Sequence, residues 1–220
     1  MRWPVAVMLL AAPSVHADSK QRANRGYVTF GATLPYQKGL SGETDPQTFL
    51  SAPAGRTQGW LLGAGVSVGH AISLELELSA TGVMRAREPY RYDLIYNLER
   101  RDRFLIMAAR YHLGRPGAAI SVEPVLGIVL ASTRTWSQAE IYSHSNPGQL
   151  VMIDAKIQRD LSVRPGIAGG FDLRFGTTHV AVVPSLRMLV TSRRDDIVPT
   201  YPSGFPVLTI RPGLALRAEF

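Results

Sequence analysis

The sequence predicts an all-β protein, an eight-stranded antiparallel up-and-down transmembrane β-barrel preceded by a cleaved signal peptide. Three observations predict this fold: apolar and polar residues alternate in successive runs, short and long connections alternate between the runs, and charged residues keep to one face. The run LTIRPGLALRAEF (Leu208–Phe220) shows the pattern, since every second residue from Leu208 onward is apolar while Arg211, Arg217 and Glu219 lie between them. This period of two is typical of a strand between two unlike surroundings.

The N-terminal residues predict export. MRWPVAVMLLAAPSVHADSK has one basic residue, Arg2, then an apolar stretch over 5–12 and the small-residue pattern Val15-His16-Ala17. This arrangement is typical of a secretory signal peptide. We expect cleavage after Ala17, which divides the chain into a signal peptide (1–17) and a barrel (18–220). The chain has no cysteine, which excludes disulfides and thiolate metal sites.

Eight alternating runs follow, and no helical period of similar strength accompanies them. They are 26–36, 57–69, 71–84, 102–114, 119–134, 161–176, 178–194 and 205–220. Short links join the second run to the third (Gly69-His70), the fourth to the fifth (GRPGA) and the sixth to the seventh (GTTH), whereas 37–56, 85–101, 135–160 and 195–204 are long. Outer-membrane barrels have this asymmetry, with tight periplasmic turns and longer external loops.

The two faces of the runs differ in charge. In 71–84, for example, Ile72, Leu74 and Leu76 share one face while Glu75 and Glu77 share the other. The charged face of the whole set carries Glu75, Glu77, Arg110, His112, Glu123, Arg164, Asp172, Arg174, Arg187, Arg211, Arg217 and Glu219. A soluble barrel needs an apolar interior and a polar exterior. Because buried ions without partners are costly, the sequence predicts the reverse arrangement, with an apolar surface toward lipid and ions in a polar lumen.

The terminal run LTIRPGLALRAEF resembles the C-terminal signature of bacterial outer-membrane barrels, an alternating strand that ends in phenylalanine. The chain is similar to small OmpA/OmpX-like barrels of the outer membrane protein beta-barrel domain group. The resemblance implies a Gram-negative cell outer-membrane location, contact with membrane lipid and lipopolysaccharide, and recognition of Phe220 as an assembly signal by the barrel-assembly machinery.

Four outward prolines run against this pattern. Pro124, Pro165, Pro184 and Pro212 fall within the runs VEPVLGI, VRPGIAG, VVPSLRM and IRPGLAL. Proline removes a ladder donor and is normally confined to edges or bulges. The repetition therefore suggests local bulges and hairpin duplication.

The lumenal charges predict an ion network. Counted from the short turns, Arg110 and Glu123 stand at similar height on adjacent strands, which predicts an ion pair. Arg187 and Arg211 are also level on adjacent strands, with Arg164 higher on the next. We expect no acid at that height on these three strands, so that Glu77 neutralises the arginines from across the lumen. The alternative is a shallow anion site.

No catalytic, metal or cofactor site is expected. SHSN places Ser145 directly after His144 in a loop, which fails the His-x-Ser spacing of barrel lipid A deacylases. Asp195 and Asp196 have no histidine partner and fit a solvated loop. No phosphate-binding loop, nucleophile elbow or metal-ligand spacing is present. The pI near 10.0 could suggest nucleic acid, but the arginines lie mostly in the lumen or loops, so we expect no nucleic-acid partner.

The function expected is therefore non-enzymatic. The barrel would have a salt-bridged, largely plugged lumen and would serve envelope structure or surface and lipopolysaccharide contact through long external loops. The loop 87–103 mixes three tyrosines with five arginines, and 135–158 is expected to continue its two strands outward to a turn at 145–148. These residues could equally form the external aromatic girdle. A porin-like, narrow anion-preferring pore for small solutes is the alternative, and a lipid-modifying enzyme is a third possibility.

Overall fold

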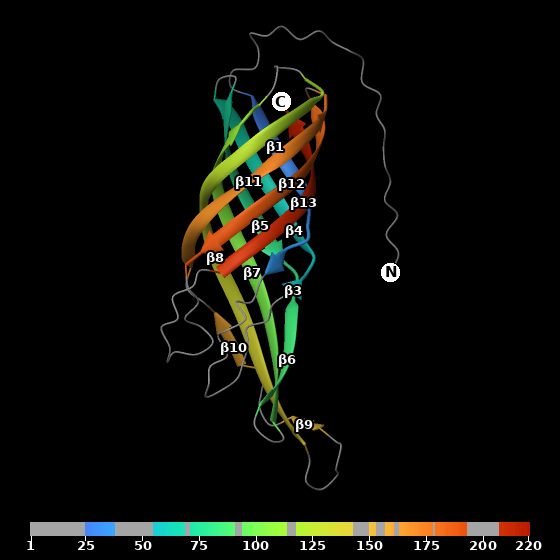
Figure 1. Cartoon of the computed structure of the whole chain (residues 1–220), viewed down its shortest axis with the longest axis vertical. Helices are drawn as coiled ribbons and strands as arrows, with labels where there is room; N and C mark the ends of the chain where they lie inside the picture. The colour runs from blue at the N-terminus through green and yellow to red at the C-terminus, as the bar shows by residue number, and fades with distance from the viewer. Residues whose placement is uncertain are drawn as a thin grey trace.

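The computed structural model of the chain is a closed barrel of tilted strands (Figure 1). It describes residues 25–37, 55–68, 71–90, 94–113, 118–142, 150–152, 157–160, 163–177, 179–192 and 207–220. The wall strands, in order, are β1 (Gly26–Thr33), β4 (Gly59–Val68), β5 (Ile72–Thr81), β7 (Leu94–Tyr111), β8 (Ile120–Tyr142), β11 (Arg164–Gly176), β12 (Val180–Thr191) and β13 (Val207–Glu219). β13 pairs with β1 and closes the sheet. The prediction of an antiparallel eight-stranded barrel is confirmed.

Five short strands accompany the wall. They are β2 (Tyr36–Gln37), β3 (Gly55–Arg56), β6 (Met84–Tyr90), β9 (Leu150–Met152) and β10 (Ile157–Asp160). No helix in the described ranges is long and apolar enough to cross a membrane. Several sequence predictions lie outside the described residues, namely the signal peptide (1–17), Gly69-His70, His144-Ser145 and Asp195-Asp196.

The outer face of the wall is apolar and exposed. Along β5, Leu74 and Leu76 are 53% and 51% exposed, whereas Glu75 and Glu77 between them are 7% and 4% exposed. None of the predicted outward positions that the structure describes is buried. An apolar exterior around an ionic interior is the arrangement of a lipid-spanning barrel, and transmembrane barrels of this kind reside in the outer membrane. The structure therefore supports the predicted location.

The stagger of the strands fixes the width of the barrel. Following the register once around the wall from Tyr27 leads through Gly65, Glu75, Ala108 and onward to Gln37, ten residues further along the chain. Eight strands with this shear tilt by about 40° and leave an interior just wide enough for side chains to fill. Side chains on opposite walls can therefore reach one another.

The long-loop end of the barrel extends into an arm (Figure 1). β7 and β8 remain paired from Arg110 opposite Val125 out to Leu94 opposite Ile141, and β6 pairs along the outer part of β7. The prediction that 85–101 is a long loop is thus wrong in large part, because β6 and the outer part of β7 pair as a hairpin. For 135–158, continuation of the strands is confirmed, since β9 and β10 both pair with β8.

The prolines do not form bulges, which corrects the expectation from sequence. Pro124 lies opposite Phe171 and Pro212 opposite Leu186, in ladders whose register is constant. Around Pro184 the β11–β12 ladder lacks two bridges, yet the register is the same on both sides of the gap. Each proline therefore lacks the backbone N–H donor of its ladder position, but none adds an extra residue to its strand as a bulge would. The carbonyls of Pro165 and Pro212 still accept backbone N–H groups at 2.9 Å.

The seam between β1 and β13 depends on a small residue. Gly31 lies opposite Ala215, and a Cβ on Gly31 would lie 2.6 Å from the Ala215 Cβ and 2.7 Å from its Cα. Gly169 is the matched case on the outer face, where an added Cβ would meet nothing within 4 Å.

We predict that Gly31→Val lowers the free energy of unfolding by about 1–3 kcal/mol through overpacking at the seam. Gly169→Val should cost little, although it makes the same change in backbone preference. Urea titration of refolded barrel, followed by the gel shift between folded and unfolded forms, measures both. Equal midpoints for the two variants would show that the seam tolerates the added volume.

Candidate functional site

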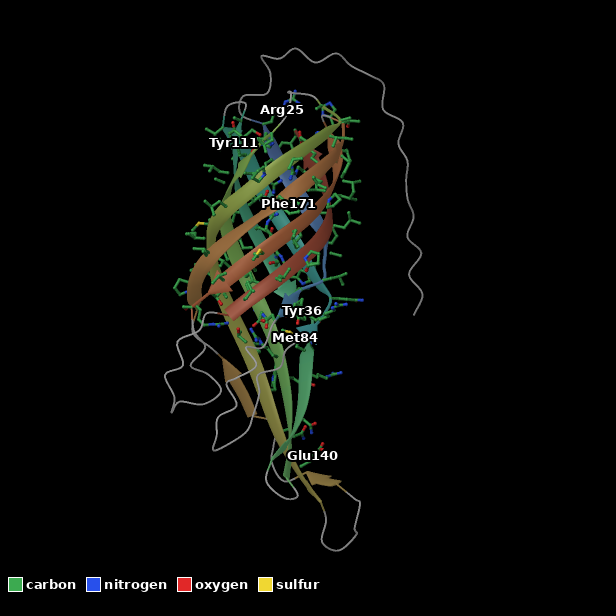
Figure 2. The ribbon with its side chains drawn as sticks, viewed as in Figure 1. Arg25, Tyr36, Met84, Tyr111, Glu140 and Phe171 are labelled. Carbon is green, nitrogen blue, oxygen red and sulfur yellow. The ribbon has the colours of Figure 1, made fainter. Side chains whose placement is uncertain are left out.

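The candidate site is the ionic lumen, whose side chains project inward from nearly every wall strand. All ten residues of the predicted charge network are buried there: Glu75, Glu77, Arg110, Glu123, Arg164, Asp172, Arg174, Arg187, Arg211 and Arg217. Figure 2 shows the contrast with the outer face, where the labelled Tyr111 and Phe171 belong to the exposed apolar surface. The inward alternation of each strand places these ions where no bulk water solvates them.

Two carboxylates at the centre lie directly opposite each other. Glu123 on β8 pairs in register with Asp172 on β11, and both are at most 1% exposed. Like charges opposite one another are destabilising unless a cation lies between them. Arg110 supplies that cation, with its guanidinium 3.1 Å from Glu123 and 2.9 Å from Asp172. Arg110 also lies 2.5 Å from Glu75, and Arg217 lies 2.8 Å from Glu123.

Two arginines form the converse pair. Arg187 on β12 lies directly opposite Arg211 on β13. Arg211 reaches across the lumen to Glu77 and Ser79 of β5, as the sequence predicted for Glu77. The expectation of no acid on the three neighbouring strands is wrong, because Asp172 forms a two-pronged ion pair with Arg187. Strand tilt brings Asp172, whose register partner is Ser185, up to the guanidinium.

Tyr27 was not anticipated as part of this network. Its hydroxyl donates to Glu75 at 2.8 Å, and its ring lies under two guanidinium groups, 5.6 Å from Arg110 and 4.9 Å from Arg217. Tyrosine is both apolar and hydrogen-bonding, so its inward position in the first run could have indicated this role. It closes the cluster on the β1 side.

A hydrogen-bond chain extends the cluster toward the short-turn end. Ser73 Oγ lies 2.6 Å from His112 Nε2, and His112 Nδ1 lies 3.0 Å from Glu123 Oε1. Ser67 Oγ adds a further contact to Ser73 at 3.1 Å. The order of serine, histidine and carboxylate is that of a hydrolase triad. No local sequence motif could reveal it, because Ser73 lies on β5, His112 lies just after β7 and Glu123 lies on β8.

A second polar cluster lies toward the long-loop end, with Asp102 at its centre. Asp102 is fully buried and accepts hydrogen bonds from Arg100 at 2.9 Å, Gln37 at 2.5 Å and Thr133 at 2.6 Å. Thr133 in turn accepts from Arg164 at 2.6 Å. The sequence analysis placed Arg100 in the loop 85–101, and it did not count Asp102, the first residue of the run 102–114, among the inward charges. The period of two continues through them and could have been extended.

An apolar cluster lies on the same inner wall, between these two polar clusters. It consists of Phe104, Ile106, Val129, Ala131, Ala168 and Leu189 from β7, β8, β11 and β12. The lumen thus contains apolar packing in addition to the ions that the sequence predicted. This packing is what the narrow interior of an eight-stranded barrel allows.

The remaining predicted residues lie apart from the centre. Arg174 pairs with Glu219 at 2.9 Å and donates to the carbonyls of Ala118 and Thr177 at the short-turn end. Phe220 exchanges two backbone hydrogen bonds of 3.0 Å with Gly26, and its side chain is 75% exposed. Its role as an assembly signal stays a prediction.

The chain is similar to known proteins only at the level of solved structures, which are outer-membrane barrels. No protein-family model matches the chain, and no curated protein matches it. Among solved structures, the chain is similar to Ail, the attachment invasion locus protein of Yersinia pestis, with 10% identity and a TM-score of 0.49 over 90% of this chain and 99% of that one. It is also similar to E. coli outer membrane protein W, with 15% identity and a TM-score of 0.47 over 91% of this chain and 100% of that one. OprG of Pseudomonas aeruginosa matches with 10% identity and a TM-score of 0.48 over 90% of this chain and 97% of that one.

Removal of the shared carboxylate tests how strongly the network stabilises the barrel. We predict that Glu123→Ala lowers the free energy of unfolding by about 3–5 kcal/mol, since it leaves Arg217 without its nearest counter-ion in a dry site. Arg85→Ala is the matched control, because the Arg85 side chain is 76% exposed and its ion pair with Glu99 should contribute no more than about 1 kcal/mol. A loss for Glu123→Ala as small as the control's in urea unfolding would mean that water reaches the cluster.

Proposed function

We propose that this chain is a non-enzymatic outer-membrane barrel whose lumen is closed by its own side chains, and that it serves envelope structure and surface contact. The observation that carries the proposal is the reciprocal pairing of ions across the lumen. Arg110, Arg187, Arg211 and Arg217 each contact a carboxylate from another strand, and none is more than 3% exposed. A permeant anion would have to displace those carboxylates.

The arm at the long-loop end supports surface contact. It carries paired strands beyond the barrel, and its base holds Arg101 at 5.9 Å from the ring of Trp136. A cation held over an aromatic ring presents charge together with an apolar face. This combination suits contact with anionic surface groups such as those of lipopolysaccharide.

Conductance distinguishes a closed lumen from a narrow pore. We predict that refolded wild-type barrel gives no steady single-channel current in planar bilayers, because side chains and ion pairs fill the interior. Arg187→Gln/Arg211→Gln should leave that result unchanged. A steady, anion-selective conductance of the wild type, lost in the double variant, would establish the pore instead.

The serine–histidine–glutamate chain is the strongest argument for an enzyme, and two features of its geometry argue against one. Ser73 is 0% exposed, which blocks the approach of a substrate to Oγ. Glu123 already neutralises the guanidinium groups of Arg110 and Arg217, so little of its charge remains to stabilise an imidazolium. The chain therefore fits an extension of the structural network.

We predict that a fluorophosphonate probe does not label the refolded barrel and that Ser73→Ala changes no ester hydrolysis above background. A nucleophilic serine would react covalently with the probe because its histidine accepts the hydroxyl proton. Intact-mass spectrometry measures labelling directly. Labelling of wild type that disappears in both Ser73→Ala and His112→Gln would overturn the non-enzymatic proposal.

A further inference from the structure

The apolar cluster of the lumen separates the central ion network from the Asp102 cluster. On each of β7, β8 and β11, residues of the apolar cluster lie between a charged residue of the ion network and a residue of the Asp102 cluster. The order along the strands is Arg110, Ile106, Phe104, Asp102 on β7; Glu123, Val129, Ala131, Thr133 on β8; and Asp172, Ala168, Arg164 on β11. The apolar cluster therefore forms a layer on this side of the lumen, with ions below it at the short-turn end and polar groups above it at the long-loop end.

An ion pair that crosses the lumen lies at the same level as the apolar cluster. Arg211 reaches from β13 to Glu77 and Ser79 of β5. These two residues are the register partners of Ile106 and Phe104, so the bridge ends beside the apolar cluster. Apolar packing on one side and a paired arginine on the other therefore close the lumen at a single level.

The apolar cluster is shielded from water on all sides. Ile106 is 1% exposed, and Val129 and Leu189 are 0% exposed. The side chains of the cluster carry no polar atom that could bind a water molecule, and even an empty cavity lined by such side chains stays dry. An ion that entered the cluster would lose its hydration shell and find no hydrogen-bonding group, at a large cost in free energy. In the ion network, by contrast, a passing ion would meet groups that could replace its water.

We propose that the apolar cluster is a hydrophobic gate, a layer that stops ions because it stays dry, and that ion pairs alone do not keep the barrel non-conducting. Hydrophobic constrictions in channels gate in this way, by excluding water rather than by charge. The gate rests on the proposed closed lumen and names the layer that closes it. The barrel is then a latent channel, because a change in the polarity of this one layer is enough to open it.

Two double variants of nearly equal size test the gate. Ile106→Ala/Leu189→Ala and Ile106→Ser/Leu189→Ser remove almost the same side-chain volume and differ by two hydroxyl groups. The alanine variant widens the layer but leaves it apolar and dry, so it should give no steady current in planar bilayers. The serine variant can hold water at the same two positions, so it should give a steady current where the wild type gives none.

The comparison of the two variants decides between apolarity and volume. Equal currents through both would show that filled volume closes the lumen, and silence of the serine variant would show that the barrier lies elsewhere. Either result overturns the gate. The gel shift of each variant confirms folding. Val129→Thr/Leu189→Asn, which adds polar atoms at nearly constant volume, takes the place of the serine variant if that barrel does not fold, and it should conduct as well.

Val125→Ser/Val183→Ser is the matched control, because both valines are buried in the lumen but lie outside the apolar cluster. Val125 lies directly opposite Arg110 of the ion network. This variant adds two hydroxyl groups and leaves the gate intact, so it should give no current. Current through it would show that any added polarity opens the lumen, and would overturn the specific gate. A conducting wild type refutes the proposed closed lumen itself, whereas a silent wild type with a silent serine variant refutes only the gate.

Discussion

The structure depends on one electrostatic constraint: an ion inside a narrow closed barrel must find its counter-charge on another strand. Glu123 and Asp172 face each other with like charge, as do Arg187 and Arg211. Neither pair is stable alone, because taking an ion out of water costs several kcal/mol. They become favourable because Arg110 reaches both carboxylates from β7, Asp172 pairs with Arg187, and Glu77 of β5 pairs with Arg211. The ion network thus ties together strands that are not neighbours in the sheet.

Barrel geometry makes these contacts possible. The ten-residue stagger around the wall tilts the strands, so residues that are distant in register come within reach of one another. The same narrowness explains the inward glycine at the seam and the apolar cluster around Ile106 and Val129. The part of the lumen that the ion pairs do not occupy is filled by apolar side chains, which need no hydrogen-bond or ionic partner. The close packing at the seam, the apolar cluster and the ion pairs across the lumen therefore all follow from the narrow interior of the barrel.

The exterior follows a different rule, because its solvent changes along the strand. Within the band, Met107, Ile128 and Leu130 meet hydrocarbon and carry no polar atoms to satisfy. One outward-facing pair further along the strands, the exposed Arg103 lies opposite Ser132. β7 and β8 stay paired in one register through this transition and into the arm.

The sequence by itself determined the fold class, the inward and outward faces and the buried ions, because a period of two is local and fixes each side chain relative to its neighbours. It even indicated the Arg110–Glu123 pair, whose strands are adjacent. It did not determine the pairing of Asp172 with Arg187, the role of Tyr27 or the Asp102 cluster. These contacts depend on strand stagger and on how far β7 continues past the barrel, and both are set by pairing between distant segments. Only the tertiary structure decided them, because the alternation along a strand contains no information about its height relative to the strand across the lumen.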